Sequence, residues 1–206
     1  MIPGPPVIYE CPFCGAKKEL MSLLSGNMVN TRCWSDNKVE SPMLPRLSYV
    51  QKCPQCGKYY LLARQKAIHK EKGIGFTLER GILSFPEMVE AFKQLNSEGM
   101  NEIEEANVRL LVLHSYNDYF YRELTDDQPT EEDKQINRTN IYWLIENWAQ
   151  DEILKAELYR EAGDLDKAIE ILSDIDVSDK TRRRIRKKIL RRAKKNVTTV
   201  FEITNL

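Results

Sequence analysis

The sequence predicts an α+β protein with a small β-rich unit over residues 1–70, an all-α domain of helical hairpins over residues 71–206, and a short C-terminal strand. Three observations support this fold class. Gly, Ser, Asn and Pro interrupt the stretch from Ser25 to Pro45, as in short strands joined by turns. From Ser84 onward, apolar residues recur at helical spacing. The C-terminal segment "NVTTVFEITNL" is rich in β-branched residues, which predicts a strand over residues 197–204.

The composition agrees with two small domains in a soluble chain. The chain has 206 residues, of which 42% are hydrophobic and 30% are charged. No apolar run approaches the roughly 18 to 20 residues needed to cross a bilayer, and the first residues do not form a secretory leader. We therefore expect a cytoplasmic protein without a membrane span.

Four of the five cysteines occur in two copies of one phrase, "CPFCG" at residues 11–15 and "CPQCG" at residues 53–57. A single Cys-Pro-aromatic-Cys resembles the redox site of glutaredoxins, but that reading explains only the first copy. Two such turns can close a tetrahedral four-thiolate metal site. The predicted metal ligands are Cys11, Cys14, Cys53 and Cys56. Four thiolates leave no open coordination position, which predicts a structural ion.

The first strand segments resemble those of a zinc ribbon, in which short antiparallel strands carry two cysteine turns. "VIYEC" precedes the first turn, and "RLSYVQKC" and "KYYLLAR" flank the second. The resemblance implies one structural Zn²⁺ per chain. Rubredoxins share the double phrase and bind iron, so iron stays a less favoured alternative. Nearby Lys17, Lys18, Lys52 and Lys58 are expected to offset part of the charge of four thiolates.

The remaining chemistry-bearing residues do not form a recognisable catalytic motif. Cys33 is expected to be a small buried residue rather than a redox thiol or a fifth ligand. His69 and His114 lie in unlike contexts, and each is expected to be a surface or core residue. No phosphate loop, Ser-His-Asp set or His-x-x-x-His helix is visible, so we expect neither an enzyme nor a small-molecule substrate.

Capping signals mark the starts of the predicted helices. Ser84 with Glu87 forms a capping box, Asn101 with Glu104 begins a second helix toward Arg122, and Thr130 begins a third. The segment "ILKAELYREAGDLDKAIEILSDI" at residues 153–175 then resembles one tetratricopeptide repeat. Small Ala156 and Ala168 allow two helices to approach, and Gly163 forms the turn. An ordinary helical hairpin is the alternative.

A ribbon followed by tetratricopeptide-like helices resembles uncharacterised bacterial proteins that contain these two units in the same order. The resemblance covers most of the chain and implies no agreed activity. Helical repeats usually present a groove to another protein. We therefore expect a non-catalytic zinc-binding adaptor that binds a protein or peptide partner.

Residues 180–195 carry eleven of the 31 basic residues and no acidic residue, in a predicted helix over residues 178–195. The rest of the chain has 20 basic and 31 acidic residues. A solvated helix that complements the acidic body is one interpretation, and attraction to anionic lipids is the weakest. The rival function is an RNA-associated module. It would use Arg182, Arg183, Arg184, Arg186, Lys187, Lys188, Arg191 and Arg192. The strand after this helix is expected to pair with the ribbon sheet or with residues 73–81.

Overall fold

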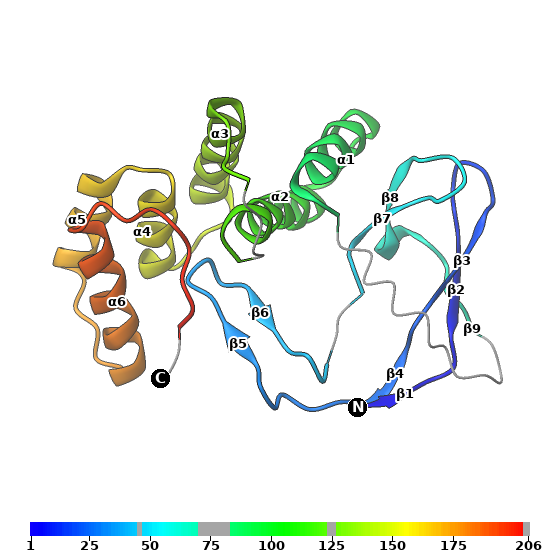
Figure 1. The fold of residues 1–206 in the computed structure, drawn as a ribbon, viewed down its shortest axis with the longest axis horizontal. Helices are drawn as coiled ribbons and strands as arrows, with labels where there is room; N and C mark the ends of the chain where they lie inside the picture. The colour runs from blue at the N-terminus through cyan, green and yellow to red at the C-terminus, as the bar shows by residue number, and fades with distance from the viewer. Residues whose placement is uncertain (45–46, 70–82, 123–126, 204–206) are drawn as a thin grey trace. The chain divides into compact units, whose positions relative to one another are not determined.

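The computed structural model describes residues 1–44, 47–69, 83–122 and 127–203 (Figure 1). Small antiparallel strand pairs occupy the N-terminal part and six α-helices the C-terminal part of these residues, which confirms the α+β class. Within the described ranges, no helix is both long and apolar enough to cross a membrane. Contacts divide the chain into two compact units, residues 1–31 with 40–108, and residues 32–39 with 109–206. The domain division near residue 70 stays a prediction.

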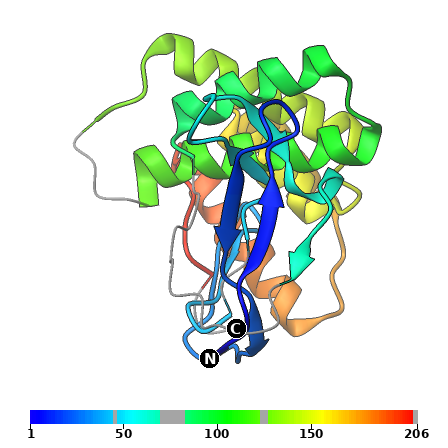
Figure 2. The same cartoon turned by 90° about the vertical axis from the view of Figure 1, so that its right-hand side faces the viewer.

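The first unit is built on short antiparallel strands (Figure 2). Two of its hairpins, β2–β3 and β7–β8, close at residues 11–16 and 53–58, where the two cysteine turns lie. The strands predicted before and after these turns are confirmed. The elements are β1 (Ile2–Pro3) paired with β4 (Leu23–Ser25), β2 (Val7–Glu10) between β3 (Lys17–Leu20) and β9 (Ile68–His69), and β7 (Val50–Lys52) paired with β8 (Tyr59–Leu61).

Helix α1 (Phe85–Glu98) packs against β8 in the same unit, after the 3₁₀ helix η1 (Leu62–Arg64). The Tyr59 hydroxyl donates to Glu90 at 2.8 Å. The Gln94 side chain accepts from the Tyr59 N–H at 3.1 Å and donates to the Tyr59 carbonyl at 2.8 Å. An unpaired strand edge leaves backbone N–H and carbonyl groups without partners. The Gln94 amide pairs with both of these groups of Tyr59 at the edge of β8.

The predicted helix starts are confirmed. The Glu87 carboxylate accepts from the Ser84 N–H at 3.1 Å, as a capping box requires. Asn101 and Thr130 each accept a backbone N–H three residues later, from Glu104 at 3.0 Å and from Asp133 at 3.1 Å. These caps satisfy N–H groups that the first helical turn cannot pair.

The second unit contains most of the helices and one small hairpin. Two apolar clusters among its described residues centre on Leu113 with Ile141, and on Leu172 with Ile189. The elements that contribute to it are β5 (Arg32–Cys33), β6 (Val39–Glu40), α2 (Glu102–Asn117), the π-helix η2 (Asp118–Arg122), α3 (Glu131–Asn147), α4 (Glu152–Glu161), α5 (Leu165–Asp174) and α6 (Lys180–Ala193).

Helices α4 and α5 form the predicted hairpin. Ala156 and Ala168 are completely buried, so the two helices approach closely where no larger side chain separates them. Gly163 between them has φ of 88°, a conformation that favours glycine. Asp179 accepts from the Arg182 N–H at 2.7 Å and thereby caps the basic helix α6.

The β5–β6 hairpin turns at Asp36, and this acidic side chain is buried. Asp36 is fully buried and accepts from Asn117 Nδ2 at 2.9 Å and from the Arg122 guanidinium. Burial alone would raise the pKa of Asp36. The charges of His114 and Arg122 have the larger, opposite effect, so the pKa lies below its usual value. The hairpin is therefore held by a buried ion pair of the helical unit.

The C-terminal segment pairs with residues 33–35. These residues lie within the predicted ribbon unit, but in the β5–β6 hairpin and not in the strands that carry the cysteine turns. The Ser35 N–H donates to the Phe201 carbonyl at 2.9 Å, and the Ile203 N–H donates to the Cys33 carbonyl at 2.7 Å. The predicted strand over residues 197–204 is reduced to a single bridge between Trp34 and Glu202. The other predicted partner, residues 73–81, lies outside the described residues.

Phe201 anchors this segment, and its truncation is expected to destabilise the second unit. The side chain is 6% exposed and shares a cluster with Ile153 and Leu172. Phe201→Ala should lower the free energy of unfolding by about 3 to 5 kcal/mol, because it removes buried area and leaves a cavity. Urea unfolding followed by circular dichroism measures the loss. Ile103→Ala, at a side chain that is 74% exposed, is the control. A loss below about 1 kcal/mol for Phe201→Ala would contradict the anchoring role.

Candidate metal centre

The two cysteine turns have the same backbone geometry. In each turn, the glycine N–H donates to the carbonyl of the first cysteine at 2.9 Å, from Gly15 to Cys11 and from Gly57 to Cys53. The first cysteine N–H then donates five residues ahead, to Ala16 at 2.8 Å and to Lys58 at 2.9 Å. Both glycines have positive φ, 74° and 73°. The repeated phrase thus folds into two equivalent turns, each presenting two sulfur atoms.

The four sulfur atoms of these turns form one cluster. All lie within 4.8 Å of one another, and Cys11 Sγ is 3.7 Å from Cys56 Sγ while Cys14 Sγ is 3.6 Å from Cys53 Sγ. A disulfide requires about 2.05 Å, so the cysteines are free thiols. A zinc ion bound by four sulfurs at about 2.3 Å places them about 3.8 Å apart. The observed spacing fits a tetrahedral four-thiolate metal site.

The thiols affect one another's ionisation. Burial raises the pKa of Cys53, but the N–H groups of Cys56 and Gln55 and the neighbouring thiols lower it to about 6. The Ala16 N–H lowers the pKa of Cys14, but desolvation and the other three thiols raise it to about 12. Four thiolates this close repel one another, so full ionisation needs a cation among them.

The cluster is part of the core of the first unit. Cys11 and Cys53 are buried, whereas Cys14 and Cys56 lie at the surface. The buried pair packs with Leu20, Tyr60 and Leu62. Burial and the nearby thiols raise the pKa of Tyr60 to about 12, which keeps its hydroxyl neutral. An ion bound here would stabilise the small apolar core around it.

Three of the lysines near the turns contact acidic side chains or an aromatic ring. Lys52 Nζ is 2.8 Å from a Glu87 carboxylate oxygen, and Lys17 Nζ is 3.5 Å from Glu10. Lys58 Nζ lies over the Phe13 ring, 4.6 Å from its centre. The positive charges expected to offset the thiolates are therefore partly compensated by nearby acids and an aromatic ring.

Of the other thiol and the two histidines, Cys33 and His114 lie outside the cluster of four cysteines. Cys33 is half-buried on β5, so the expectation that it is buried is wrong. His114 Nε2 lies 3.2 Å from the Asp36 carbonyl oxygen, which makes His114 a core residue with a polar partner. His69 ends β9, and its side chain lies outside the described part of the chain.

Several of the basic residues predicted to bind RNA make contacts within the second unit, although Arg182 and Arg183 are themselves exposed. The guanidinium of Arg182 pairs with Asp151, that of Arg183 donates to the Val177 carbonyl at 3.0 Å, and that of Arg186 donates to the Leu172 carbonyl at 2.6 Å. Arg192 lies 4.2 Å from the centre of the Phe201 ring, and Lys188 is half-buried. The other exposed members of the set are Arg184, Lys187 and Arg191.

The second unit also contains a polar pocket that the sequence does not indicate. Its lining includes Asn117, Asn137 and Glu161. No local motif marks these residues, since they come from three separate helices.

No protein-family model, curated protein or solved structure matches the chain. The four-cysteine cluster and the α+β fold are therefore the basis for a functional proposal.

Proposed function

We propose that the protein is a non-catalytic zinc-binding adaptor in which a structural ion stabilises the ribbon and the helical unit binds a protein or peptide. The observation that carries this proposal is the closed cluster of four cysteine sulfurs. With all four positions of a tetrahedral ion occupied by sulfur, a water molecule or substrate has no coordination site. The same donor set accommodates iron, but the chain between the cysteine turns is longer and more polar than in the compact rubredoxins, which favours zinc.

The helical hairpin α4–α5 supports the second part of the proposal. Its buried Ala156 and Ala168 and its turn at Gly163 match the resemblance to a tetratricopeptide repeat. Stacked helical hairpins bury one face against each other and leave a second face for an extended partner.

Site-specific photo-crosslinking in cells tests the adaptor. A photoreactive residue placed at exposed Asp174 on α5 should give discrete protein adducts that depend on the intact fold. The same probe at exposed Lys187 on α6 is the matched comparison. RNA adducts from α6, with no protein adduct from α5, would contradict the adaptor and favour the rival function.

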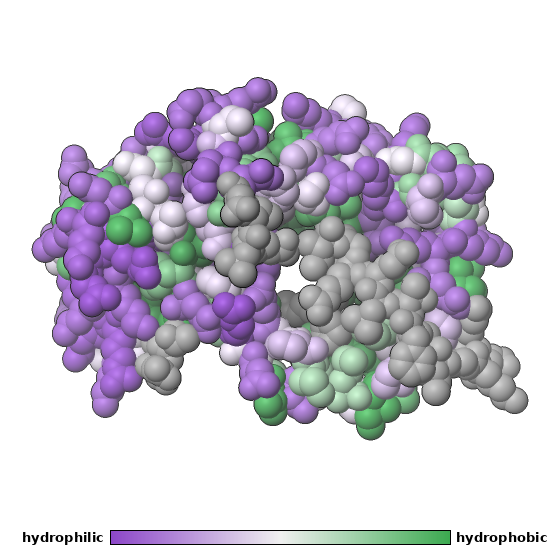
Figure 3. All heavy atoms as spheres, viewed as in Figure 1, coloured by the Kyte–Doolittle hydropathy of each residue, from purple (hydrophilic) through white to green (hydrophobic). Residues whose placement is uncertain are grey.

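The exposed part of α6 supports an RNA-associated module as the second candidate. Arg184, Lys187 and Arg191 are spaced by three and four residues, so they share one helical face. Lys187, Arg191, Lys194 and Lys195 surround a shallow hollow of about 300 Å³ with Leu190 at its side. Figure 3 shows a largely hydrophilic surface over α5 and α6.

A salt series with labelled RNA tests this candidate. If α6 contacts phosphates, changing Arg184, Lys187 and Arg191 to Glu should lower affinity and reduce the slope of log K against log salt by about two. The matched variant changes Arg182, Arg183 and Arg186, whose guanidinium groups already bind within the second unit. The candidate fails if the wild type does not bind RNA at low salt, or if the exposed triple variant keeps the full slope.

A further inference from the structure

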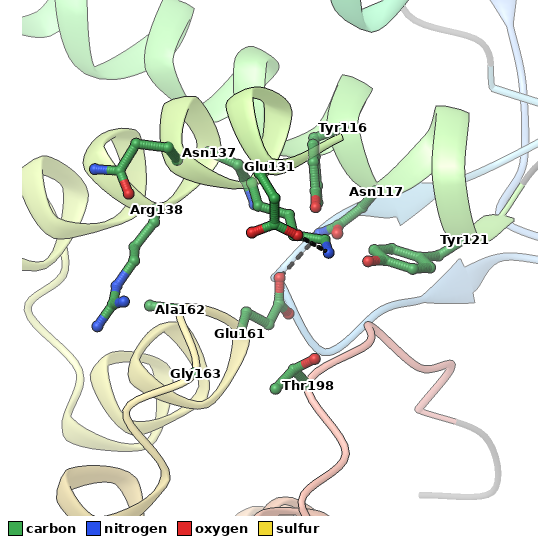
Figure 4. Close-up of a pocket in the computed structure, with 12 residues that line it drawn as sticks. Tyr116, Asn117, Tyr121, Glu131, Asn137, Arg138, Glu161, Ala162, Gly163 and Thr198 are labelled. Carbon is green, nitrogen blue, oxygen red and sulfur yellow. Dashed lines mark hydrogen bonds and ion pairs between the residues drawn. The ribbon is translucent and has the colours of Figure 1, made fainter. Parts of the chain in front are cut away.

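A pocket of about 280 Å³ opens in the second unit, where α2, η2, α3 and α4 meet the C-terminal segment. Figure 4 shows Tyr116, Tyr121 and Glu161 directed toward a common space, with Thr198 at its lower side. The pocket belongs wholly to residues 116–198 and is separate from the cysteine cluster.

Two buried oxygen acceptors of this pocket have no hydrogen-bond donor in the described part of the chain. They are Oε1 of Glu161 and Oδ1 of Asn137. The Glu161 side chain is 3% exposed, and its Oε2 accepts from Asn117 Nδ2 at 2.9 Å. The nearest cation to Oε1, Arg160 Nη2, lies 3.7 Å away, beyond hydrogen-bond distance. Since buried acceptors are normally satisfied, the pocket is complementary to a ligand that brings donors.

The cations around the pocket are paired with other acids. Lys134 Nζ binds Glu131 at 2.6 Å, and Arg138 binds Asp164 at 3.0 Å. Arg160, next to Glu161 in sequence, makes two hydrogen bonds to Glu157, at 2.5 Å and 2.7 Å. Burial raises the pKa of Glu161 well above its usual value, and the charges of Glu157 and Asp36 raise it further. The raised pKa favours the neutral acid in the absence of a bound cation, and a cation beside Glu161 would favour the carboxylate. The Arg160 guanidinium lies 3.7 Å from Glu161, but its hydrogen bonds go to Glu157 and to two backbone carbonyls.

Two tyrosines form an aromatic wall beside Glu161. The rings of Tyr116 and Tyr121 lie 5.8 Å apart at an angle of 70°, so they present surfaces in different directions. Aromatic faces attract organic cations, and a buried carboxyl group that ionises when a cation binds beside it supplies the opposite charge.

We propose that this pocket binds one organic cation, a guanidinium or primary ammonium group on a chain the size of an arginine or lysine side chain. Glu161 and Asn137 accept its N–H groups, and Tyr116 and Tyr121 contact its charged face. The cation belongs either to a free small molecule or to a side chain of a peptide. This inference does not depend on the metal site or on the adaptor.

Isothermal titration of the full chain tests the proposal with N-acetyl-arginine amide and N-acetyl-lysine amide, up to about 10 mM. N-acetyl-citrulline amide has nearly the shape of the arginine probe without its charge and should not bind. Glu161→Gln keeps the shape of the side chain and should weaken binding by about 10- to 100-fold, because it replaces a charge-assisted hydrogen bond with a neutral one. Glu170→Gln, at an exposed position on α5, is the matched control and should bind as the wild type does.

Tyr121→Leu provides a second variant that removes one of the two rings of the aromatic wall, and it should also weaken binding of the cationic probes. Thermal melts of all variants establish that they fold. Methylguanidine distinguishes the two sources: affinity equal to that of the arginine amide indicates a free small cation, and tighter binding of the amide indicates a peptide side chain. The proposal is overturned if neither cationic amide binds, if the citrulline amide binds equally well, or if folded Glu161→Gln binds as the wild type does.

Discussion

Replacing Cys14 with serine is expected to release the metal ion and unfold the N-terminal ribbon. Cys14 lies at the surface, so the substitution removes almost no buried area and acts through ligation. The apparent binding free energy of structural four-ligand zinc sites is about 10 to 16 kcal/mol. The net stability of a whole domain is only about 5 to 15 kcal/mol, so the ribbon depends on the ion. Metal content and amide hydrogen exchange of residues 7–20 and 50–61 measure the effect.

Cys33→Ser is the matched control for this experiment. It makes the same chemical change in a thiol outside the cluster, and it should leave metal content and ribbon exchange unchanged. If Cys14→Ser retained one metal ion per chain together with wild-type protection of the ribbon, the four-thiolate account would be wrong.

Removal of the Glu157 carboxylate is expected to give the second large effect. Glu157 and Arg160 are fully buried on α4, and their two hydrogen bonds measure 2.5 Å and 2.7 Å. Arg160 also donates to the Val197 and Thr199 carbonyls, at 2.5 Å and 3.2 Å. Glu157→Ala leaves this guanidinium buried without its counter-ion. A loss of about 3 to 5 kcal/mol in the free energy of unfolding should follow.

Urea unfolding of Glu157→Ala beside Glu152→Ala measures this loss. Glu152 lies on the same helix in an exposed pair with Lys155 at 3.1 Å, so its removal should cost no more than about 0.5 kcal/mol. Equal stability of the two variants would show that the buried pair does not hold the C-terminal segment in place.

The sequence predicts those parts of the fold that depend on local signals. The double Cys-x-x-Cys-Gly phrase determines two six-residue turns, because glycine allows the positive φ that each turn requires. Ser84, Asn101 and Thr130 mark helix starts, since each side chain and its partner are only three residues apart. Four cysteines in two matching turns can also be predicted to converge, although 39 residues separate Cys14 from Cys53.

Long-range polar contacts could not be predicted from the same signals. Asp36 and Arg122 form a buried ion pair, but they lie 86 positions apart in the sequence. The pairing of Ser35 with Phe201 likewise depends on how the helices pack, and an alternation of Thr and Val does not specify the partner strand. The position of Glu161 at the end of a predicted helix does not distinguish it from a surface residue. Only the assembled unit shows that its carboxyl is buried.

X-ray absorption at the metal edge, with elemental analysis of the same purified sample, tests whether the four cysteines form a closed metal site. We expect one zinc ion per chain with four sulfur neighbours at about 2.3 Å and no oxygen or nitrogen neighbour. A protein with no bound metal, or a metal with an oxygen or nitrogen in its first shell, would contradict a closed structural site formed by Cys11, Cys14, Cys53 and Cys56.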